Sequence, residues 1–238
     1  MSTMYAQIGV FHHYIVSPFS WLIDHFAGWF DGSFGLALIA ITVLVRLALM
    51  PFMINQYKKQ QTMRVKLAAM QPEMEAIKLK HAASKDPDKQ RKQTEETMAL
   101  YGKHGYNPLA IGCLPMLLQI PILSGLYYAI RSNPEMAHHT FLWFQLGSSD
   151  LVMPFLAAAV YLVQAIVARS SQPSQKGMGW IIYLSPIMMG AFSFTAPAAL
   201  PLYWCVGGLI MILQTLIAKR LYPAPAEAGV VTVSAGTA

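Results

Sequence analysis

The sequence predicts an all-α, polytopic membrane protein with five transmembrane helices, a cytoplasmic helical hairpin and an N-terminal interfacial helix. Of the 238 residues, 55% are hydrophobic and 12% are charged, about half the charged fraction of a typical soluble domain. Long apolar stretches recur along the chain, and lysines and arginines gather between alternate pairs of them. The predicted spans are residues 34–54, 109–130, 151–168, 180–196 and 201–218.

Residues 1–33 form the predicted extracytoplasmic segment, and residues 15–30 within it are expected to be an amphipathic interfacial helix. Its apolar face carries Phe19, Leu22, Ile23, Phe26 and Phe30 at helical spacing. Two tryptophans on this helix, Trp21 and Trp29, suit the headgroup region. The chain is then expected to turn into the membrane at Asp31-Gly32.

The first span, residues 34–54, contains a single charge, Arg46. An unpaired guanidinium near mid-membrane costs from ~2.5 to more than ~10 kcal/mol. Such a group therefore needs water, a partner or a function. The structural alternative is snorkelling, because Ile54 lies eight residues further on, about 12 Å along a helix.

Residues 56–107 are the only long hydrophilic segment and predict a basic cytoplasmic hairpin. One arm covers about 57–83, a turn lies at 84–88 and the return arm ends near 103, with a kink expected at Pro72. Lys78 and Lys80 lie off the apolar face of the first arm. That face comprises Met63, Leu67, Met70, Met74 and Ile77. It suits adaptable binding of apolar partners, or equally a hairpin packed along its own apolar stripe.

The remaining spans contain prolines, and the last two are joined by a tight turn around Ala196, Pro197 and Pro201. The five-span core, with the hairpin inside it, covers residues 34–220. Residues 221–238 are expected to be a disordered cytoplasmic tail.

Charge placement predicts the orientation. Residues 55–108 carry eleven lysines and arginines, whereas residues 1–33 carry none. Basic residues are retained on the cytoplasmic side, so the N-terminus is expected outside and the C-terminus inside. The formal net charge of +6 is therefore concentrated on the cytoplasmic face. It can contact anionic lipid headgroups, or additionally an acidic partner such as ribosomal RNA or a nascent chain.

No Asp or Glu lies in any other predicted span, so Arg46 has no intramembrane ion pair available. Its expected companions are neutral polar side chains, namely Thr42, Gln119, Gln164, Ser193 and Thr195. Such groups favour a hydrated cavity that opens to the cytoplasm. Interhelical hydrogen bonding is the alternative for the two glutamines. Tyr203 and Trp204 begin the last span, where anchoring in an aromatic belt is the default explanation.

Enzyme chemistry has no support in the sequence. Phosphate-loop, dinucleotide, HExxH and GxSxG motifs are absent. The adjacent pairs His12-His13 and His138-His139 lack the spacing and carboxylate or thiolate help of metal ligands. No catalytic residue, metal, cofactor or DNA partner is expected.

Four segments together resemble the YidC/Oxa family of membrane protein insertases, in its short, Gram-positive-like form. They are VRLALMPFMINQYKKQQTM, QPEMEAIKLKH, MALYGKHGYNPLAIGCLPMLLQIPILSGLYYAI and LPLYWCVGGLIMILQTLI. The resemblance covers about residues 15–220 in consistent order.

The resemblance implies a five-helix core around a hydrophilic groove that opens to the cytoplasm and to lipid and is sealed outside. Arg46 matches the groove arginine, Gln119 and Gln164 fall in the corresponding spans, and Trp204 falls at an aromatic substrate-contacting position. Residues 56–107 match the mobile hairpin needed for activity. The implied partners are nascent membrane proteins, the ribosome and the Sec translocon in a bacterial plasma membrane.

Two departures from the family pattern affect these expectations. Residues 1–33 lack the lipoprotein signal with its cysteine that many single-membrane members carry, which puts lipid anchoring in doubt. The tail after Arg220 lacks the basic extension that helps some members to hold ribosomes, so ribosome binding is expected to be weak.

The predicted function is insertion of nascent membrane proteins without nucleotide hydrolysis. Two other hypotheses remain: a small-solute or anion transporter or channel, and an assembly factor without insertase activity. Internal repeats, which many transporters contain, are absent from the sequence.

Overall fold

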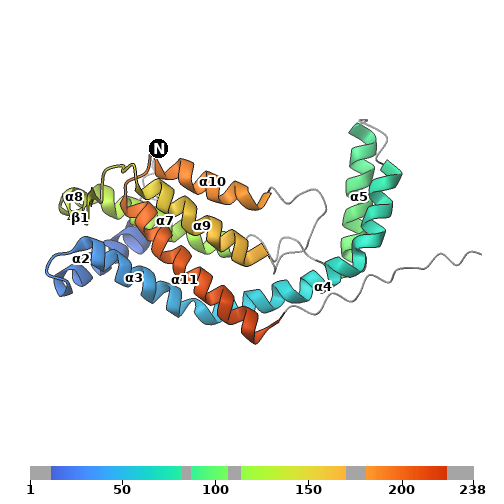
Figure 1. The fold of residues 1–238 in the computed structure, drawn as a ribbon, viewed down its shortest axis with the longest axis horizontal. Helices are drawn as coiled ribbons and strands as arrows, with labels where there is room; N and C mark the ends of the chain where they lie inside the picture. Colours follow the sequence, from blue (N-terminus) through green and yellow to red (C-terminus); the bar gives the residue numbers. More distant parts are fainter. Residues whose placement is uncertain (1–11, 82–86, 107–113, 170–180, 224–238) are drawn as a thin grey trace, which may run out of the picture.

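The computed structural model describes residues 12–81, 87–106, 114–169 and 181–223, and these are mostly helical (Figure 1). A short two-stranded antiparallel ribbon is the only β structure in these ranges. The elements, in chain order, are the π-helix η1 (His12–Val16), α2 (Ser17–Trp29), α3 (Phe34–Ala48), α4 (Met50–His81), α5 (Pro87–Lys103), α7 (Leu114–Ser132), α8 (Pro134–His138), β1 (Thr140–Phe141), β2 (Phe144–Gln145), α9 (Met153–Arg169), α10 (Ile181–Ser193) and α11 (Ala199–Leu221).

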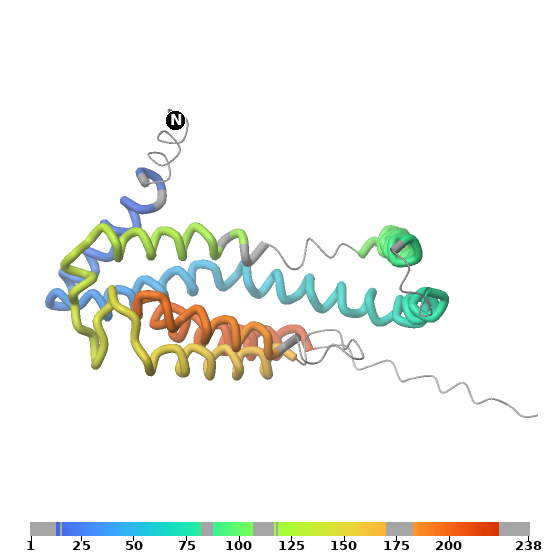
Figure 2. The backbone as a smooth tube through the Cα atoms, turned by 90° about the horizontal axis from the view of Figure 1, so that it is seen from above, coloured from blue at the N-terminus to red at the C-terminus, as the bar shows by residue number. Residues whose placement is uncertain are grey.

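The last helix, α11, is the centre of a helical bundle. It packs against α9 on one side and α3 on another, and more sparsely against α7 and α4. α10 packs against α9, outside α11 (Figures 1 and 2). Helix α3, from the N-terminal part of the chain, and helix α9 therefore both pack along α11.

The predicted N-terminal amphipathic helix is present as α2. Its inner face buries Ile23 and Ala27, which are 1% and 3% exposed. Trp21 and Trp29 are 63% and 67% exposed, on the face away from the bundle. The predicted turn follows, since Asp31 and Gly32 both have positive φ, 52° and 82°. A glycine takes this left-handed conformation without a steric penalty, and α3 leaves α2 at 117°.

The helices divide before the predicted end of the first span. The sequence predicted one span over 34–54 and a separate arm from 57, but α3 ends at Ala48 and α4 runs unbroken from Met50 to His81. Pro51 explains the early break. It has no N–H to donate to the carbonyl of Leu47, but it fits the first turn of a new helix.

The hairpin itself is present, and its arms are α4 and α5 (Figure 1). Leu67, Met70 and Leu100 form a small core between the arms, flanked by Met74 and Ile77. Pro72 lies within α4 without ending it. The predicted turn at 84–88 lies mostly outside the described residues, as does the predicted disordered tail beyond 223.

The segment 131–150, which joins the second and third predicted spans, is a cap on one end of the bundle. It contains α8 and the β1–β2 ribbon. Backbone amides tie it to the start of α11: Ala198 donates to the carbonyl of Ser148 at 2.8 Å, and Ala199 to that of Leu146 at 3.0 Å. No local sequence pattern predicts this cap, because the hydrogen bonds join positions about fifty residues apart.

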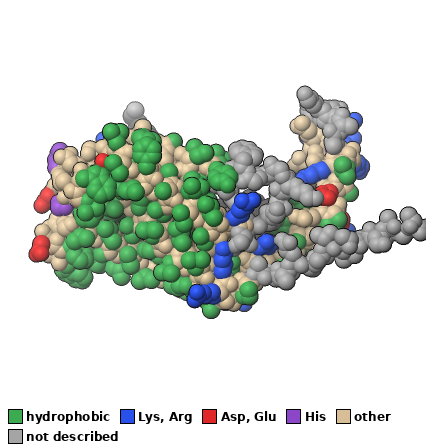
Figure 3. Space-filling model, in the orientation of Figure 1, with side chains coloured by type: hydrophobic (Ala, Val, Ile, Leu, Met, Phe, Trp, Pro, Cys, Tyr) green, Lys and Arg blue, Asp and Glu red, His purple; other side chains and the backbone are tan. Residues whose placement is uncertain are grey.

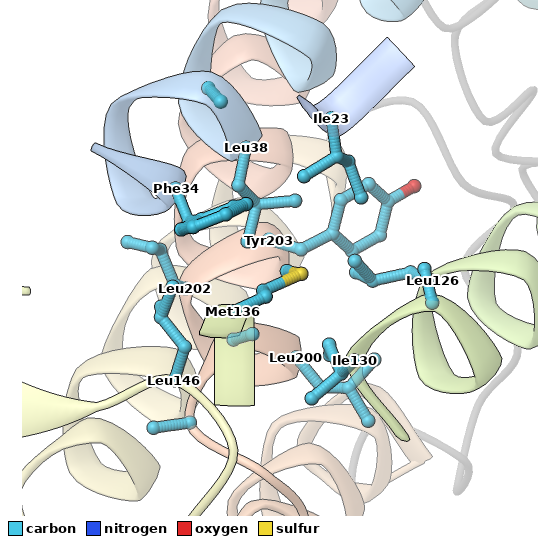
Figure 4. Close-up of a cluster of buried hydrophobic side chains, with 14 of the residues drawn as sticks. Ile23, Phe34, Leu38, Leu126, Ile130, Met136, Leu146, Leu200, Leu202 and Tyr203 are labelled. Atoms are coloured by element: carbon cyan, nitrogen blue, oxygen red, sulfur yellow. The ribbon is translucent and has the colours of Figure 1, made fainter. Parts of the chain in front are cut away.

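The main hydrophobic core lies under this cap (Figure 4). It gathers buried side chains from α2, α3, α7 and α11, from the segment that leads into α11, and from the cap itself. They include Ile23, Leu38, Leu126, Ile130, Met136 and Leu146, all at 1% exposure or less. Close packing of this kind is typical of protein interiors.

The other predicted spans correspond to α7, α9, α10 and α11, although residues 109–113 and 180 lie outside the described ranges. Within those ranges, only α11 is long and apolar enough to cross a bilayer as a single straight helix. The bent pair α2 and α3 would make a second span at most, and α9 is a shorter apolar helix. The count of five spans therefore stays a prediction.

The face of the bundle seen in Figure 3 is strongly apolar. Hydrophobic side chains cover the visible face, while acidic and histidine side chains lie at the capped end and basic ones where the bundle meets α4. Exposed apolar residues on α9 and α10 include Phe155, Ile166, Ile187 and Phe192, each at least 56% exposed. An apolar band of this extent needs a cover of lipid or protein.

Candidate functional site

Arg46 lies in the last turn of α3, facing α11. Its guanidinium is so close to Gly207 that a Cβ at that position would be 2.9 Å from an Arg46 terminal nitrogen and 3.2 Å from Nε. Among the described residues, no carboxylate lies within ion-pairing distance of Arg46. The sequence prediction of an unpaired charge among neutral groups is therefore consistent with the structure.

Gly207 and Gly208 let α11 approach two different helices. Gly207 faces Arg46 of α3, whereas a Cβ on Gly208 would lie 2.6 Å from Val160 of α9. Small residues permit such approaches between membrane helices. The pair thus fixes the spacing of α3, α11 and α9 at the level of the arginine.

Gln214 is a further member of this site that the sequence reasoning missed. Its Nε2 donates a 2.8 Å hydrogen bond to the backbone carbonyl of Arg46, and its Oε1 has no partner among the described residues. Gln214 is only 5% exposed. The signal was present, because a glutamine within an apolar span was the same cue that selected Gln119 and Gln164.

Gln119 and Tyr203, both predicted site residues, contact each other. The Nε2 of Gln119 on α7 donates to the Tyr203 hydroxyl on α11 at 2.8 Å. Tyr203 is 3% exposed, so it does not lie in a lipid-facing aromatic belt. This bond supports the interhelical alternative for Gln119 and links α7 to the helix that faces Arg46.

Gln164 on α9 lies on the other side of α11. Its Nε2 is 3.7 Å from the sulfur of Met211, a weak acceptor, and its Oε1 is buried without a partner among the described residues. A Cβ at Gly208 would be 3.8 Å from that Oε1. A half-satisfied amide in an apolar setting is costly, which favours contact with water or a ligand.

Thr42 and Trp204 are not joined to this group by any described hydrogen bond. The Thr42 hydroxyl donates to the carbonyl of Leu38 in its own helix at 2.7 Å and is 2% exposed. Trp204 is 6% exposed and belongs to the main hydrophobic core. Its predicted role in contacting substrates stays a prediction, and in this conformation its ring is covered.

The hairpin residues occupy different environments. Met70 is fully buried between α4 and α5, with Met74 packed beside it, as the self-packed alternative predicted. Met63 lies outside that core and is half-buried. Lys78 is exposed, while Lys80 forms a 2.8 Å ion pair with Glu96.

Ion pairs close the hairpin at both ends. Near the tip, Lys80 and His81 both meet Glu96, and the Lys80 hydrogen bond is the main cause of the lowered pKa of that carboxyl. Near the base, Glu73 lies 3.4 Å from the Nζ of Lys103 and 3.2 Å from the Nε2 of His104. The two exposed lysine pairs add a little stability each and help to set the register of the arms.

Taken together, most of the polar side chains of this site lie on α11 or face it. From the capped end inward, α11 presents Tyr203, then the glycine beside Arg46, then Gln214, and its last turn carries Lys219 and Arg220. The core beneath the cap is apolar, and the other end of the bundle is basic. This arrangement can hold a polar or anionic segment part of the way into an apolar bundle.

Comparison with known proteins gives a consistent result. Residues 25–225 match the family described as 60Kd inner membrane protein. The chain is 43% identical to the membrane protein insertase MisCB of Bacillus subtilis strain 168 over 227 residues, which is 91% of this chain and 82% of that protein. It is 46% identical to the membrane protein insertase YidC 2 of Listeria monocytogenes over 218 residues, covering 90% and 78% of the two.

A solved structure is also similar. The crystal structure of an active YidC insertase, with its first transmembrane domain resolved, aligns with a TM-score of 0.61 at 30% identity. The alignment covers 85% of this chain and 46% of the solved one.

Proposed function

Because this chain belongs to the YidC family of membrane protein insertases, we propose that it guides nascent membrane proteins from the cytoplasm into the bilayer through a polar groove containing Arg46. The main observation that supports a polar groove is the position of Arg46. A guanidinium without a described carboxylate partner lies beside a glycine of the central helix, below an apolar, close-packed cap.

The groove would act by lowering the cost of moving a short polar tail into the membrane. Arg46 would attract an acidic or carbonyl-rich tail, while Gln119, Gln164 and Gln214 would supply neutral hydrogen-bonding groups. Transfer of the substrate's own apolar helix into lipid, at ~25 cal/mol per Å2 of buried surface, supplies the driving force. No nucleotide is needed.

The close-packed cap supports the proposal that substrates reach the groove from one side of the membrane only. Its core is fully buried, and backbone hydrogen bonds hold it to α11. The opposite end carries basic residues in the last turns of α9 and α11. By the charge rule, we place that end in the cytoplasm of a bacterium and the N-terminus outside, in a multi-pass plasma-membrane protein.

The hairpin would receive the nascent chain, beside a ribosome or a Sec translocon. Exposed basic residues such as Lys78 could meet an acidic partner directly. Its methionine face is different, since Met70 is enclosed between the arms. Use of that face as a receiving surface therefore requires α4 and α5 to separate.

The test is reconstitution of the purified chain alone into vesicles, with a substrate that carries a short acidic tail. We expect insertion without nucleotide. Arg46→Ala should lower insertion of this substrate about tenfold, the effect of losing ~1.4 kcal/mol of electrostatic attraction. Arg46→Lys should largely retain it. Arg131→Ala is the matched control, because Arg131 lies at the capped end, next to Tyr127.

The outcomes separate the hypotheses. Normal insertion of the acidic substrate by Arg46→Ala would show that the electrostatic role is wrong. Failure of the unmodified chain to insert anything, despite binding substrates, would favour an assembly factor. Flux of small anions through the vesicle membrane would favour a channel or transporter.

A further inference from the structure

A second polar site lies where α4 passes the end of α11, away from the Arg46 site. An open pocket of about 490 Å3 is formed there by one face of α4 and the residues that end α11. Its lining residues are Lys58, Gln61, Thr62, Val65, Lys66, Leu221, Tyr222 and Pro223. The five α4 residues recur at helical spacing, so they share one face.

Gln61 is the unexplained group of this pocket. It is 6% exposed, yet neither its Nε2 nor its Oε1 has a hydrogen-bond partner among the described residues. Buried amides are nearly always satisfied, and an orphaned one destabilises the fold. A ligand in the pocket that both accepts and donates a hydrogen bond would satisfy both atoms.

The charge of the pocket selects an anion. Lys58 and Lys66 flank Gln61 along the same helix face. The Nζ of Lys58 lies 5.6 Å from the centroid of the Tyr222 ring, and Lys66 donates to the carbonyl of Gly105 at 3.1 Å. Each ammonium has donors to spare. The partial negative charge at the end of α11 is offset by Lys219 and Arg220 in its last turn.

The rest of the lining is apolar. Val65, Leu221 and Pro223 form the wall on either side of the polar groups. The pocket also lies directly beyond the apolar part of α11, at the level where basic side chains border the hydrophobic band (Figure 3). A ligand for this site therefore combines an anionic group with an apolar portion.

We propose that this pocket binds the headgroup of an anionic phospholipid from the cytoplasmic leaflet. The phosphate accepts hydrogen bonds from the Gln61 amide nitrogen and the flanking lysines, and a headgroup hydroxyl donates to the Gln61 amide oxygen. The glycerol and the first acyl carbons lie against Leu221 and Val65. The inference rests on the membrane location proposed above, but binding can be measured without any insertion assay.

The experiment measures lipid binding to the full chain in neutral detergent, by native mass spectrometry and by thermal unfolding. The probes are phosphatidylglycerol, phosphatidylcholine with the same acyl chains, and soluble glycerol phosphate. We expect phosphatidylglycerol to bind tightly and to raise the unfolding temperature. Glycerol phosphate at the same concentration should not, which distinguishes a lipid from a free phosphate.

Three variants test the assignment. Gln61→Leu should weaken phosphatidylglycerol binding about tenfold, since it removes a charge-assisted hydrogen bond. Without lipid it should unfold at or above the temperature of the unmodified chain, because the orphaned amide is gone. Lys58→Gln should weaken binding about fivefold. Lys59→Gln, which removes the same charge from an exposed residue outside the pocket, should change binding less than about twofold.

Several results would overturn the proposal. Equal binding of the two phospholipids would remove the charge argument, and an equal effect of Lys58→Gln and Lys59→Gln would indicate diffuse surface attraction. A photoreactive side chain in place of Thr62 should give lipid adducts in native membranes. Adducts only with polypeptide, including the chain's own residues after 223, would assign the pocket to another occupant.

Discussion

Gln119 of α7 donates a 2.8 Å hydrogen bond to the hydroxyl of Tyr203 on α11, joining two residues 84 positions apart. α7 packs less extensively on α11 than α9 does. This bond is therefore a specific polar link in a sparse interface. It lies at the boundary between the apolar cap and the polar groups around Arg46.

Removal of either partner should weaken this interface. We expect Tyr203→Phe to lower the free energy of unfolding by about 1 kcal/mol, and Gln119→Leu by a similar amount. In a double-mutant cycle the second substitution should then cost little, because the bond is already absent. Thermal or denaturant unfolding in detergent measures this. Additive effects of the two substitutions would show that the bond contributes no coupling energy.

Gly207 and Gly208 should respond differently to alanine. At Gly207 the three atoms nearest to the new methyl belong to the flexible end of Arg46, so stability should change by less than about 1 kcal/mol. Insertion of acidic-tailed substrates should nevertheless fall, because the guanidinium is displaced. At Gly208 the methyl meets Val160 of α9, and overpacking should cost about 1–3 kcal/mol. Unfolding and insertion assays on both variants check these expectations, and each variant serves as the control for the other.

Water access to the proposed groove can be tested with cysteine labelling. In a chain whose Cys113 and Cys205 are replaced by serine, Gln119→Cys and Gln164→Cys should react with a membrane-impermeant thiol reagent from the cytoplasmic side. Leu126→Cys, at a position in the cap core with 0% exposure, should remain unreactive. If both glutamine positions are inert, snorkelling becomes the better explanation of Arg46.

Met70 should determine whether the hairpin holds together. Its side chain is fully buried between the arms, so Met70→Ala should destabilise their pairing by about 2 kcal/mol. Hydrogen exchange of α4 and α5 amides should then become faster. Met98→Ala is the control, since Met98 is 61% exposed on α5. Similar exchange rates in both variants would contradict the self-packed hairpin.

Acid should weaken the closure of the hairpin tip. The hydrogen bond from Lys80 lowers the pKa of Glu96 from its usual 4.5. A depressed carboxyl pKa gives stability that is present above pH 4.5 and is lost as the pH falls through the lowered value. Spin labels at Leu79 and Lys92 would report the widening. Glu96→Gln should abolish this pH dependence, and Glu95→Gln, at an exposed neighbour, should preserve it.

The sequence by itself determined the local features of this protein. Periodicity of apolar residues located α2 and the first hairpin arm, Gly32 marked the turn into α3, and the lone charge in the first apolar stretch singled out Arg46 as the candidate site residue. These features depend on residues within a few positions of one another. Only the tertiary structure decided that Gln119 meets Tyr203, that Gln214 holds the carbonyl of Arg46, and that residues 131–150 cap the bundle. Such pairings depend on how helices distant in the chain pack together, and helical periodicity identifies a buried face without identifying what that face meets.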